Sequence, residues 1–121
     1  MVAATFVYMS VPLPVHPGPS AAACCVPPVG LDSGLAAARV AAVAKALSEP
    51  VRVHVLDVLR RSAEPVCQCE LVALFEIKQS LLSHHMRKLV DAGLVEVERR
   101  HKWAYYSVAP DAGKELSTWL N

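Results

Sequence analysis

The sequence predicts an α+β domain, mostly α-helical, in which two strands form a hairpin before the last helix. Three observations predict it. Apolar residues recur at helical spacing in several segments, prolines and a glycine mark the ends of these segments, and residues 94–108 have the pattern of two strands joined by a charged turn. A chain of 121 residues with 54% hydrophobic and 19% charged residues has the length and composition of one globular domain.

The first 33 residues differ in composition from the rest of the chain. They hold six of the nine prolines, and Asp32 is their only charged residue, so no regular helix or strand is expected there. We expect a flexible arm at 1–33, which carries Cys24 and Cys25, and an ordered domain at 34–121. A secretory signal is disfavoured because no Lys or Arg precedes the apolar stretch and prolines interrupt it. Since no run is long enough to span a membrane, the expected location is the cytoplasm.

Two helices are expected to begin the domain. Ser33 is a candidate N-cap for an alanine-rich helix over about 34–47, whose small residues permit close approach of a partner chain. Ser48 is a candidate cap for the second helix, and Pro50 suits the first turn of that helix because the N–H that proline lacks would be unpaired there. Pro65 ends this segment.

A short helix, a tight turn and a longer helix follow. The sequence predicts the short helix at Glu70–Phe75 and the longer one at Gln79–Ala92, with Gly93 as the residue after its C-cap. The hairpin comes next, with a charged tip at 98–102, and a last helix is expected from Pro110 to the C-terminus. This order of elements is typical of a winged helix-turn-helix with a two-stranded wing, a fold that reads DNA.

The longer helix has one apolar and one polar face. Its apolar stripe consists of Leu82, Met86, Leu89 and Val90. A helix fits the major groove, and polar side chains of this kind hydrogen-bond base edges and phosphates of double-stranded DNA. The stretch from Lys78 to Tyr106 holds six Lys or Arg against three acids, although the whole chain carries a formal charge of only +1. The predicted DNA-contacting residues are Gln79, Ser80, Ser83, His84, His85, Arg87 and Lys88 on the helix and Arg99, Arg100 and Lys102 on the wing.

This helix has two other interpretations, a solvated polar face and a metal site at its two histidines. Polar helix faces are common, so the alternative to a DNA contact is a merely solvated face. His84 and His85 are adjacent and project about 100° apart on a helix, so they do not readily share a metal ion. We expect His84 to contact DNA and His85 to be half-buried.

Four cysteines without a secretory signal indicate metal binding or redox chemistry rather than structural disulfides. Ligation by thiolates alone selects soft ions: As(III) or Sb(III) needs three, whereas Cd(II), Pb(II) or Zn(II) prefer four. Cys24, Cys25, Cys67 and Cys69 can supply either number. Residues two apart diverge in a regular helix, so Cys67 and Cys69 can share an ion only if Cys67 lies before the first turn. Otherwise one of them is a bystander, and the plainest alternative is a pair of small buried hydrophobic residues.

Four motifs occur in a recognisable order along the domain. They are Ala46–Arg52 (ALSEPVR), Val66–Leu71 (VCQCEL), Ser83–Leu89 (SHHMRKL) and Ala92–Val95 (AGLV). With these motifs the chain resembles the arsenic-responsive repressor (ArsR/SmtB) family over roughly Leu35 to Leu120. The resemblance implies a homodimer whose first and last helices form the interface, a DNA-reading helix that carries Ser-His-His, and inducer sites that differ in position between members.

The resemblance also gives the cysteines a role. Cys67 and Cys69 correspond to the family's Cys-x-Cys, and Cys24 and Cys25 resemble the N-terminal cysteines of some thiolate-type members. This sequence has Cys-Gln-Cys-Glu-Leu where many members have Cys-Val-Cys-Asp-Leu, and it lacks a third Cys in the following turn. An arm cysteine is therefore needed for a three-thiolate site. Residues 111–121 contain no His and one Glu, which argues against the family's zinc, nickel or cobalt site on the last helix.

The resemblance thus implies a repressor that binds operator DNA as a homodimer and dissociates when its thiolates bind As(III) or Sb(III). A Cd(II) or Pb(II) sensor and a repressor that responds to thiol oxidation on the same scaffold are the alternatives. An enzyme is not expected, because no general base accompanies a nucleophile in a recognisable motif and no glycine-rich phosphate loop is present. We expect no organic substrate and no membrane partner.

Overall fold

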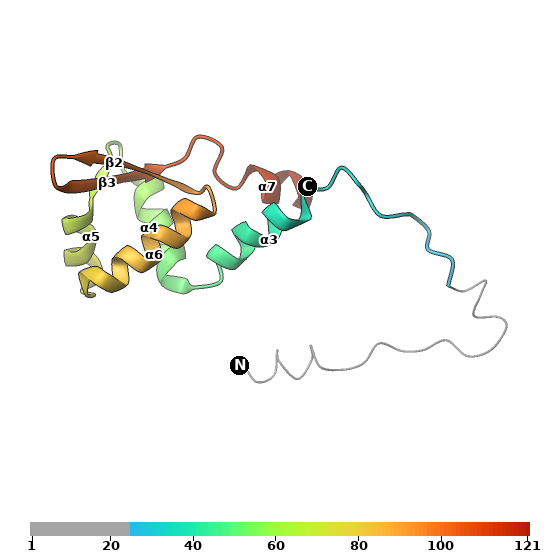
Figure 1. Cartoon of the computed structure of the whole chain (residues 1–121), viewed down its shortest axis with the longest axis horizontal. Coiled ribbons are helices and arrows are strands. Elements are labelled where there is room, and N and C mark those ends of the chain that lie inside the picture. Colours follow the sequence, from blue (N-terminus) through green and yellow to red (C-terminus); the bar gives the residue numbers. More distant parts are fainter. Residues whose placement is uncertain (1–24) are drawn as a thin grey trace, which may run out of the picture. The chain divides into compact units, whose positions relative to one another are not determined.

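The computed structural model describes residues 25–121, of which Leu35–Asn121 packs as one unit. In this unit five helices and a small antiparallel sheet follow one another in the order α3, α4, β1, α5, α6, β2, β3, α7 (Figure 1). The fold class predicted from the sequence, a mostly helical winged helix-turn-helix with a two-stranded wing, is confirmed. None of the helices within residues 25–121 is both long enough and apolar enough to cross a bilayer.

The first helix, α3 (Ala37–Ala46), begins later than the sequence suggested. Ser33 does not cap it, because the helix starts after Ala36, which forms no side-chain cap. The preceding turn has its own hydrogen bond, from the backbone N–H of Gly34 to the Asp32 carboxylate at 2.9 Å. The local acceptor at Asp32 therefore forms a turn where we expected the first turn of the helix.

The second helix, α4 (Pro50–Arg61), has Pro50 in its first turn as predicted. Its N-cap is Glu49 rather than Ser48, and no side chain caps it. The Ser48 hydroxyl instead donates to the backbone carbonyl of Lys45 at 2.7 Å. Ser48 thus satisfies one of the free carbonyls at the end of α3, and the expectation that it caps α4 is wrong.

Two helices, α5 (Gln68–Phe75) and α6 (Gln79–Asp91), form the helix-turn-helix. Gly93 follows the C-cap of α6 with φ +76°, a conformation that favours glycine. Its N–H donates to the carbonyl of Val90 at 2.9 Å, and the N–H of Leu94 donates to Leu89 at 3.0 Å. These two bonds end α6 and direct the chain into the wing.

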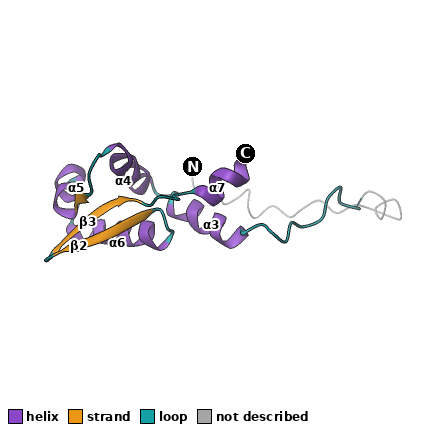
Figure 2. Ribbon diagram, turned by 90° about the horizontal axis from the view of Figure 1, so that it is seen from above, coloured by secondary structure: helices purple, strands orange, loops and turns teal. Residues whose placement is uncertain are grey.

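The wing consists of β2 (Val95–Arg100) and β3 (Trp103–Val108), which pair in antiparallel register around a turn at 101–102. Figure 2 shows the turn of this hairpin extending beyond the helices. A third strand, β1 (Val66–Cys67), pairs with the other edge of β3, so the strand order is β1-β3-β2. The sequence did not predict β1, which links the start of α5 directly to the wing.

The last helix, α7 (Lys114–Leu120), starts four residues after Pro110, because a turn with Gly113 at φ +70° comes first. α3 and α7 lie side by side at the end of the unit opposite the tip of the wing (Figure 1). An ion pair between Arg39 and Glu115 at 2.9 Å joins them. The buried core between the helices and the sheet consists of Val43, Ala46, Val55, Leu59, Leu71, Leu82, Met86, Leu89, Leu94, Val95, Ala104 and Tyr106.

Candidate functional site

Helix α6 presents the polar face that the sequence predicted. Leu82, Met86 and Leu89 are fully buried and fix the helix against the core. The opposite side chains are exposed, apart from Ser83, which is half-buried. The exposed residues of the predicted set on this helix are Gln79, Ser80, His84, Arg87 and Lys88. Five polar side chains are therefore exposed and available to contact DNA if α6 lies in a major groove.

His85 does not belong to this exposed face. Its side chain is 7% exposed, and its Nδ1 lies 3.2 Å from Nη1 of Arg52. Because arginine only donates, Nδ1 accepts and the ring is neutral. Burial lowers the pKa of His85, and the Arg52 charge lowers it further. The inclusion of His85 among the DNA contacts is therefore corrected: this side chain has an internal partner.

A groove runs between α6 and the wing strand β2. It encloses about 250 Å³ and has Ser83 and Arg87 on the helix side and Arg99 on the strand side. Both guanidinium groups are exposed, and the salt bridges within residues 25–121 include neither. Two unpaired cations that flank a polar groove form a site suited to an anionic backbone such as that of DNA.

Arg100 and Lys102 have neighbours of their own on the wing. The Arg100 guanidinium contacts the Glu98 carboxylate at 3.2 Å and lies over the ring of Tyr105, 4.4 Å from its centroid. The Lys102 ammonium lies 5.4 Å from the centroid of the Trp103 ring. Glu98 offsets part of the charge of Arg100, whereas Arg99 has no ion-pair partner among the described residues and is free to meet a phosphate.

The cysteine pair lies where β1 meets α5. Cys67 is the N-cap residue of α5, with extended backbone angles, and its Sγ lies 2.8 Å from Sγ of Cys69. Cys67 thus precedes the first turn, which is the condition for both sulfurs to face one ion. The backbone N–H of Cys67 donates to Oε1 of Glu70 at 2.9 Å and fixes the start of the helix.

The two thiols differ in their surroundings. Cys67 is 5% exposed, whereas Cys69 is exposed, and neither forms a disulfide. The thiol of Cys69 donates to the sulfur of Cys67, which is the main reason that the pKa of Cys69 is raised. The pair offers two sulfurs to one soft ion. Among residues 25–121, no group of three or more His, Cys, Asp or Glu side chains is arranged to hold a metal ion.

Of the two arm cysteines, the structure describes only Cys25. Cys25 is exposed. Cys24, the other predicted ligand, lies outside the described residues. The predicted connection between the arm and the Cys67/Cys69 pair stays a prediction.

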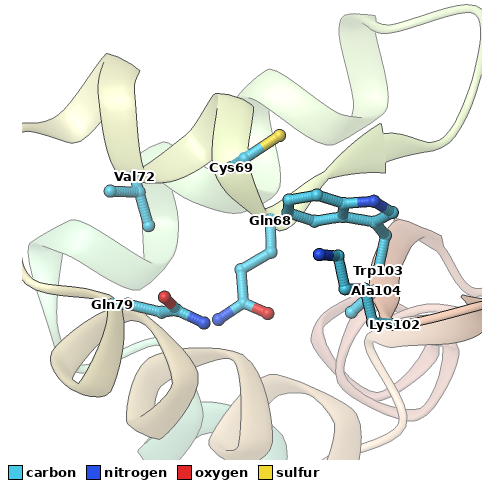
Figure 3. A pocket seen from close by; sticks show the side chains of 7 residues that line it. All are labelled: Gln68, Cys69, Val72, Gln79, Lys102, Trp103 and Ala104. Atoms are coloured by element: carbon cyan, nitrogen blue, oxygen red, sulfur yellow. The ribbon is translucent and has the colours of Figure 1, made fainter.

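A second cavity, of about 350 Å³, lies beside Cys69 and reaches the start of α6 and the wing. Across it the side-chain amides of Gln68 and Gln79 point toward one another, and the indole of Trp103 forms the wall on the side of the wing (Figure 3). Cys69, the start of α6 and the wing thus share one cavity. Sequence reasoning missed Gln68 and Trp103, although the position of Gln68 between two candidate ligands was a usable signal.

Gln68 also joins α5 to α6 by a side-chain hydrogen bond. Its Nε2 donates to Oγ of Ser83 at 2.7 Å. The residue between the two cysteines is therefore hydrogen-bonded to a residue of the candidate DNA interface.

Comparison with known proteins gives consistent results. Residues 49–97 match the profile of bacterial regulatory proteins of the arsR family. An arsenical resistance operon repressor from Bacillus subtilis is 36% identical over 64 residues, which is 53% of this chain and 60% of the relative. A Halobacterium salinarum protein, named "Putative arsenical resistance operon repressor ArsR2", is 34% identical over 84 residues, or 69% of this chain and 70% of the relative.

A cadmium resistance regulator homologue from Staphylococcus aureus is 35% identical over 77 residues, which is 64% of this chain and 63% of the relative. Among solved structures, the homodimeric winged helix-turn-helix domain of a possible ArsR-family regulator from Mycobacterium bovis superposes with a TM-score of 0.59. It is 26% identical, and the match covers 74% of this chain and 85% of that domain. The aligned segments thus span less than two thirds of several relatives, including 60% of the Bacillus subtilis repressor.

Proposed function

The chain belongs to the arsR family of bacterial regulatory proteins, and from this premise we propose that it is a homodimeric repressor that releases operator DNA on capture of As(III) or Sb(III). Family and fold are those of DNA-binding transcriptional regulators, which are not enzymes. The observation that carries the proposal is the 2.8 Å separation of the Cys67 and Cys69 sulfurs at the start of the helix that precedes α6.

In the DNA-bound state, α6 of each protomer enters a major groove. Two such helices fit successive grooves when their centres are about 34–36 Å apart, which a symmetric dimer provides. Ser83, His84 and Arg87 supply contacts to bases and phosphates, and Arg99 supplies a phosphate contact from the wing. Gln79, Ser80 and Lys88 lie on the same exposed face and extend the contact surface. Arg100 and Lys102 add positive charge near the duplex.

In the ion-bound state, Cys67 and Cys69 supply two thiolates and an arm cysteine, Cys24 or Cys25, supplies the third. Thiolates are the ligands that As(III) and Sb(III) prefer, and three of them complete the coordination of either ion. If this state holds α6 and the wing less well for DNA, operator affinity falls by the coupling free energy, typically about 1–3 kcal/mol. By linkage, operator DNA weakens ion binding by the same factor.

The test uses the full chain and a fluorescent duplex that the chain selects from a random-sequence pool. Anisotropy gives the Kd for DNA with and without sodium arsenite, in the presence of a phosphine reductant. We expect arsenite to release the wild-type chain. The paired variant Cys67→Ser with Cys69→Ser should bind DNA as tightly as wild type, because Ser also caps a helix, but should not respond to arsenite. Release of this variant by arsenite would contradict the proposal.

The arm needs its own variant. We expect the pair Cys24→Ser with Cys25→Ser to bind DNA normally and to lose its response to arsenite. Normal release of this variant would mean that the third thiolate comes from an external thiol and that the arm is not a ligand. The Cys67/Cys69 pair would then still be the core of the site.

A Cd(II) or Pb(II) sensor is the second candidate, favoured by the similarity to the cadmium resistance regulator homologue. The four cysteines of the chain match the four thiolates that these ions prefer. The same titration with cadmium chloride and lead nitrate separates the candidates, because the cognate ion releases DNA at the lowest concentration. Release by hydrogen peroxide that the reductant reverses would favour the thiol-oxidation alternative.

A further inference from the structure

We propose that Gln68 is the positioning residue that connects the cysteine pair to the DNA-reading helix, through its hydrogen bond to Ser83. This inference rests on the proposed function. Its basis is the bond from Nε2 of Gln68 to Oγ of Ser83 at 2.7 Å, which joins the first residue of α5 to the middle of α6.

The bond controls the hydroxyl that faces the groove. Ser83 is half-buried and lines the groove between α6 and β2 together with Arg87 and Arg99. When its oxygen accepts from the Gln68 amide, the rotamer of Ser83 is fixed and its own O–H remains free to donate. Gln68 therefore keeps one DNA-contacting group in a single orientation.

The position of Gln68 makes this bond sensitive to the cysteines. Its backbone lies directly between Cys67 and Cys69. Any backbone movement that brings both sulfurs onto one ion therefore also moves the backbone of Gln68. Gln68 also lines both cavities, the one beside Cys69 and the one beside Arg99. Since a hydrogen bond weakens steeply as its geometry departs from linear, a small rotation of this first turn is enough to release Ser83.

The experiment replaces Gln68 with leucine, which keeps the size and removes the amide. Three quantities are measured: binding of sodium arsenite from its thiolate absorbance, the Kd for the selected duplex without ion, and the ratio of Kd values with and without arsenite. We expect arsenite to bind at least as tightly as it binds wild type, because ion capture no longer has to break this bond. DNA affinity without ion should fall roughly three- to tenfold, and the arsenite-induced ratio should fall by the same factor. This pattern is expected of a bond that orients Ser83 for DNA and is broken when the ion is captured.

Two further variants separate coupling from loss of structure. In a Ser83→Ala background, Gln68→Leu should have no additional effect on DNA affinity, because the partner is already absent. Phe75→Leu, on the same helix, packed against the core and outside the lining of both cavities, should lower stability and leave the arsenite-induced ratio unchanged.

The outcomes differ for the two proposals. An unchanged ratio in Gln68→Leu, with arsenite still bound and wild type still released, would overturn the role of Gln68 alone. The role of Gln68 would also be overturned if Gln68→Leu lowered DNA affinity equally in the wild-type and Ser83→Ala backgrounds. If wild type fails to bind arsenite or to release DNA, the proposed function fails and the coupling role fails with it.

Discussion

Arg52 and His85 form a partly buried contact that joins α4 to α6. Nη1 of Arg52 lies 3.2 Å from Nδ1 of His85, while Nε of the same guanidinium donates to the carbonyl of Ala46 at 2.6 Å. One arginine thus connects the end of α3, the start of α4 and the middle of the reading helix. This contact requires a neutral imidazole, because a protonated ring has no lone pair to accept from arginine.

The first prediction concerns acid pH. The pKa of His85 lies below its ordinary value near 6.5 in the folded chain, because of burial and the Arg52 charge. Between these two values the unfolded chain binds a proton that the folded chain does not, so the free energy of unfolding falls as pH drops below 6.5. Urea titrations at several pH values should show this loss in wild type. His85→Asn, which still accepts from Arg52 but does not titrate, should show a smaller loss, and an equal loss would contradict the assignment.

A second prediction concerns the wing. Arg99 faces the groove without an ion-pair partner, so Arg99→Ala should weaken binding to all duplexes alike and reduce the slope of log K against log salt by about one. Arg60→Ala is the matched control, since Arg60 is an exposed arginine of α4 that is paired with Asp57 at 2.8 Å. We expect no change of slope in the control. The same slope in wild type and Arg99→Ala would exclude a phosphate contact.

The proposed dimer interface gives a third prediction. Trp119 and Leu120 of α7 are 55% and 69% exposed in the single chain, an arrangement that suits burial against a second copy. Trp119→Lys should therefore shift the sedimentation coefficient from dimer to monomer at micromolar concentration and weaken operator binding at least about tenfold. Leu74→Lys replaces a 60% exposed residue of α5 and should leave the dimer intact. A dimeric Trp119→Lys would place the interface elsewhere.

A fourth prediction concerns the end of α6. Gly93 has φ +76°, and an added methyl group there would meet no atom within 4 Å, so only backbone strain opposes a side chain. Gly93→Ala should lower the free energy of unfolding by about 1–2 kcal/mol. Gly30→Ala is the control, because Gly30 also has open space around it and no positive φ. Urea unfolding at a fixed chain concentration measures both, and equal stability of the two variants would refute the strain argument.

Much of this fold could be predicted because its signals are local. The spacing of Leu82, Met86 and Leu89 defined α6, and Gly93 marked its end. Strand β1 was missed because two residues are too few to show alternation, and only pairing with β3 makes them a strand. Helix starts were set by local hydrogen bonds of Asp32 and Ser48, which propensity does not reveal.

The candidate site was predicted less completely. His85 lies three residues after Leu82 and four before Leu89, so helical spacing alone assigns it to the buried face. The sequence predicted a half-buried side chain there, which does not agree with its place among the predicted DNA contacts. Residues Arg52 and Gln68 act through partners that are 33 and 15 positions away in the sequence. Contacts of that range depend on tertiary packing and have no periodic signal.

The unequal burial of the two neighbouring sulfurs decides which of the two positions is better suited to redesign of the proposed ion site. Cys67 serves the fold in three ways, as a strand residue opposite Tyr105, as a helix N-cap and as a 5% exposed side chain. Cys69 has an exposed side chain on the first turn of α5. Exchanging the donor atom at Cys69 for an imidazole or a carboxylate therefore disturbs the packing less than the same exchange at Cys67. For the ion site proposed above, libraries aimed at new selectivity belong at position 69 and in the wall of the adjoining cavity.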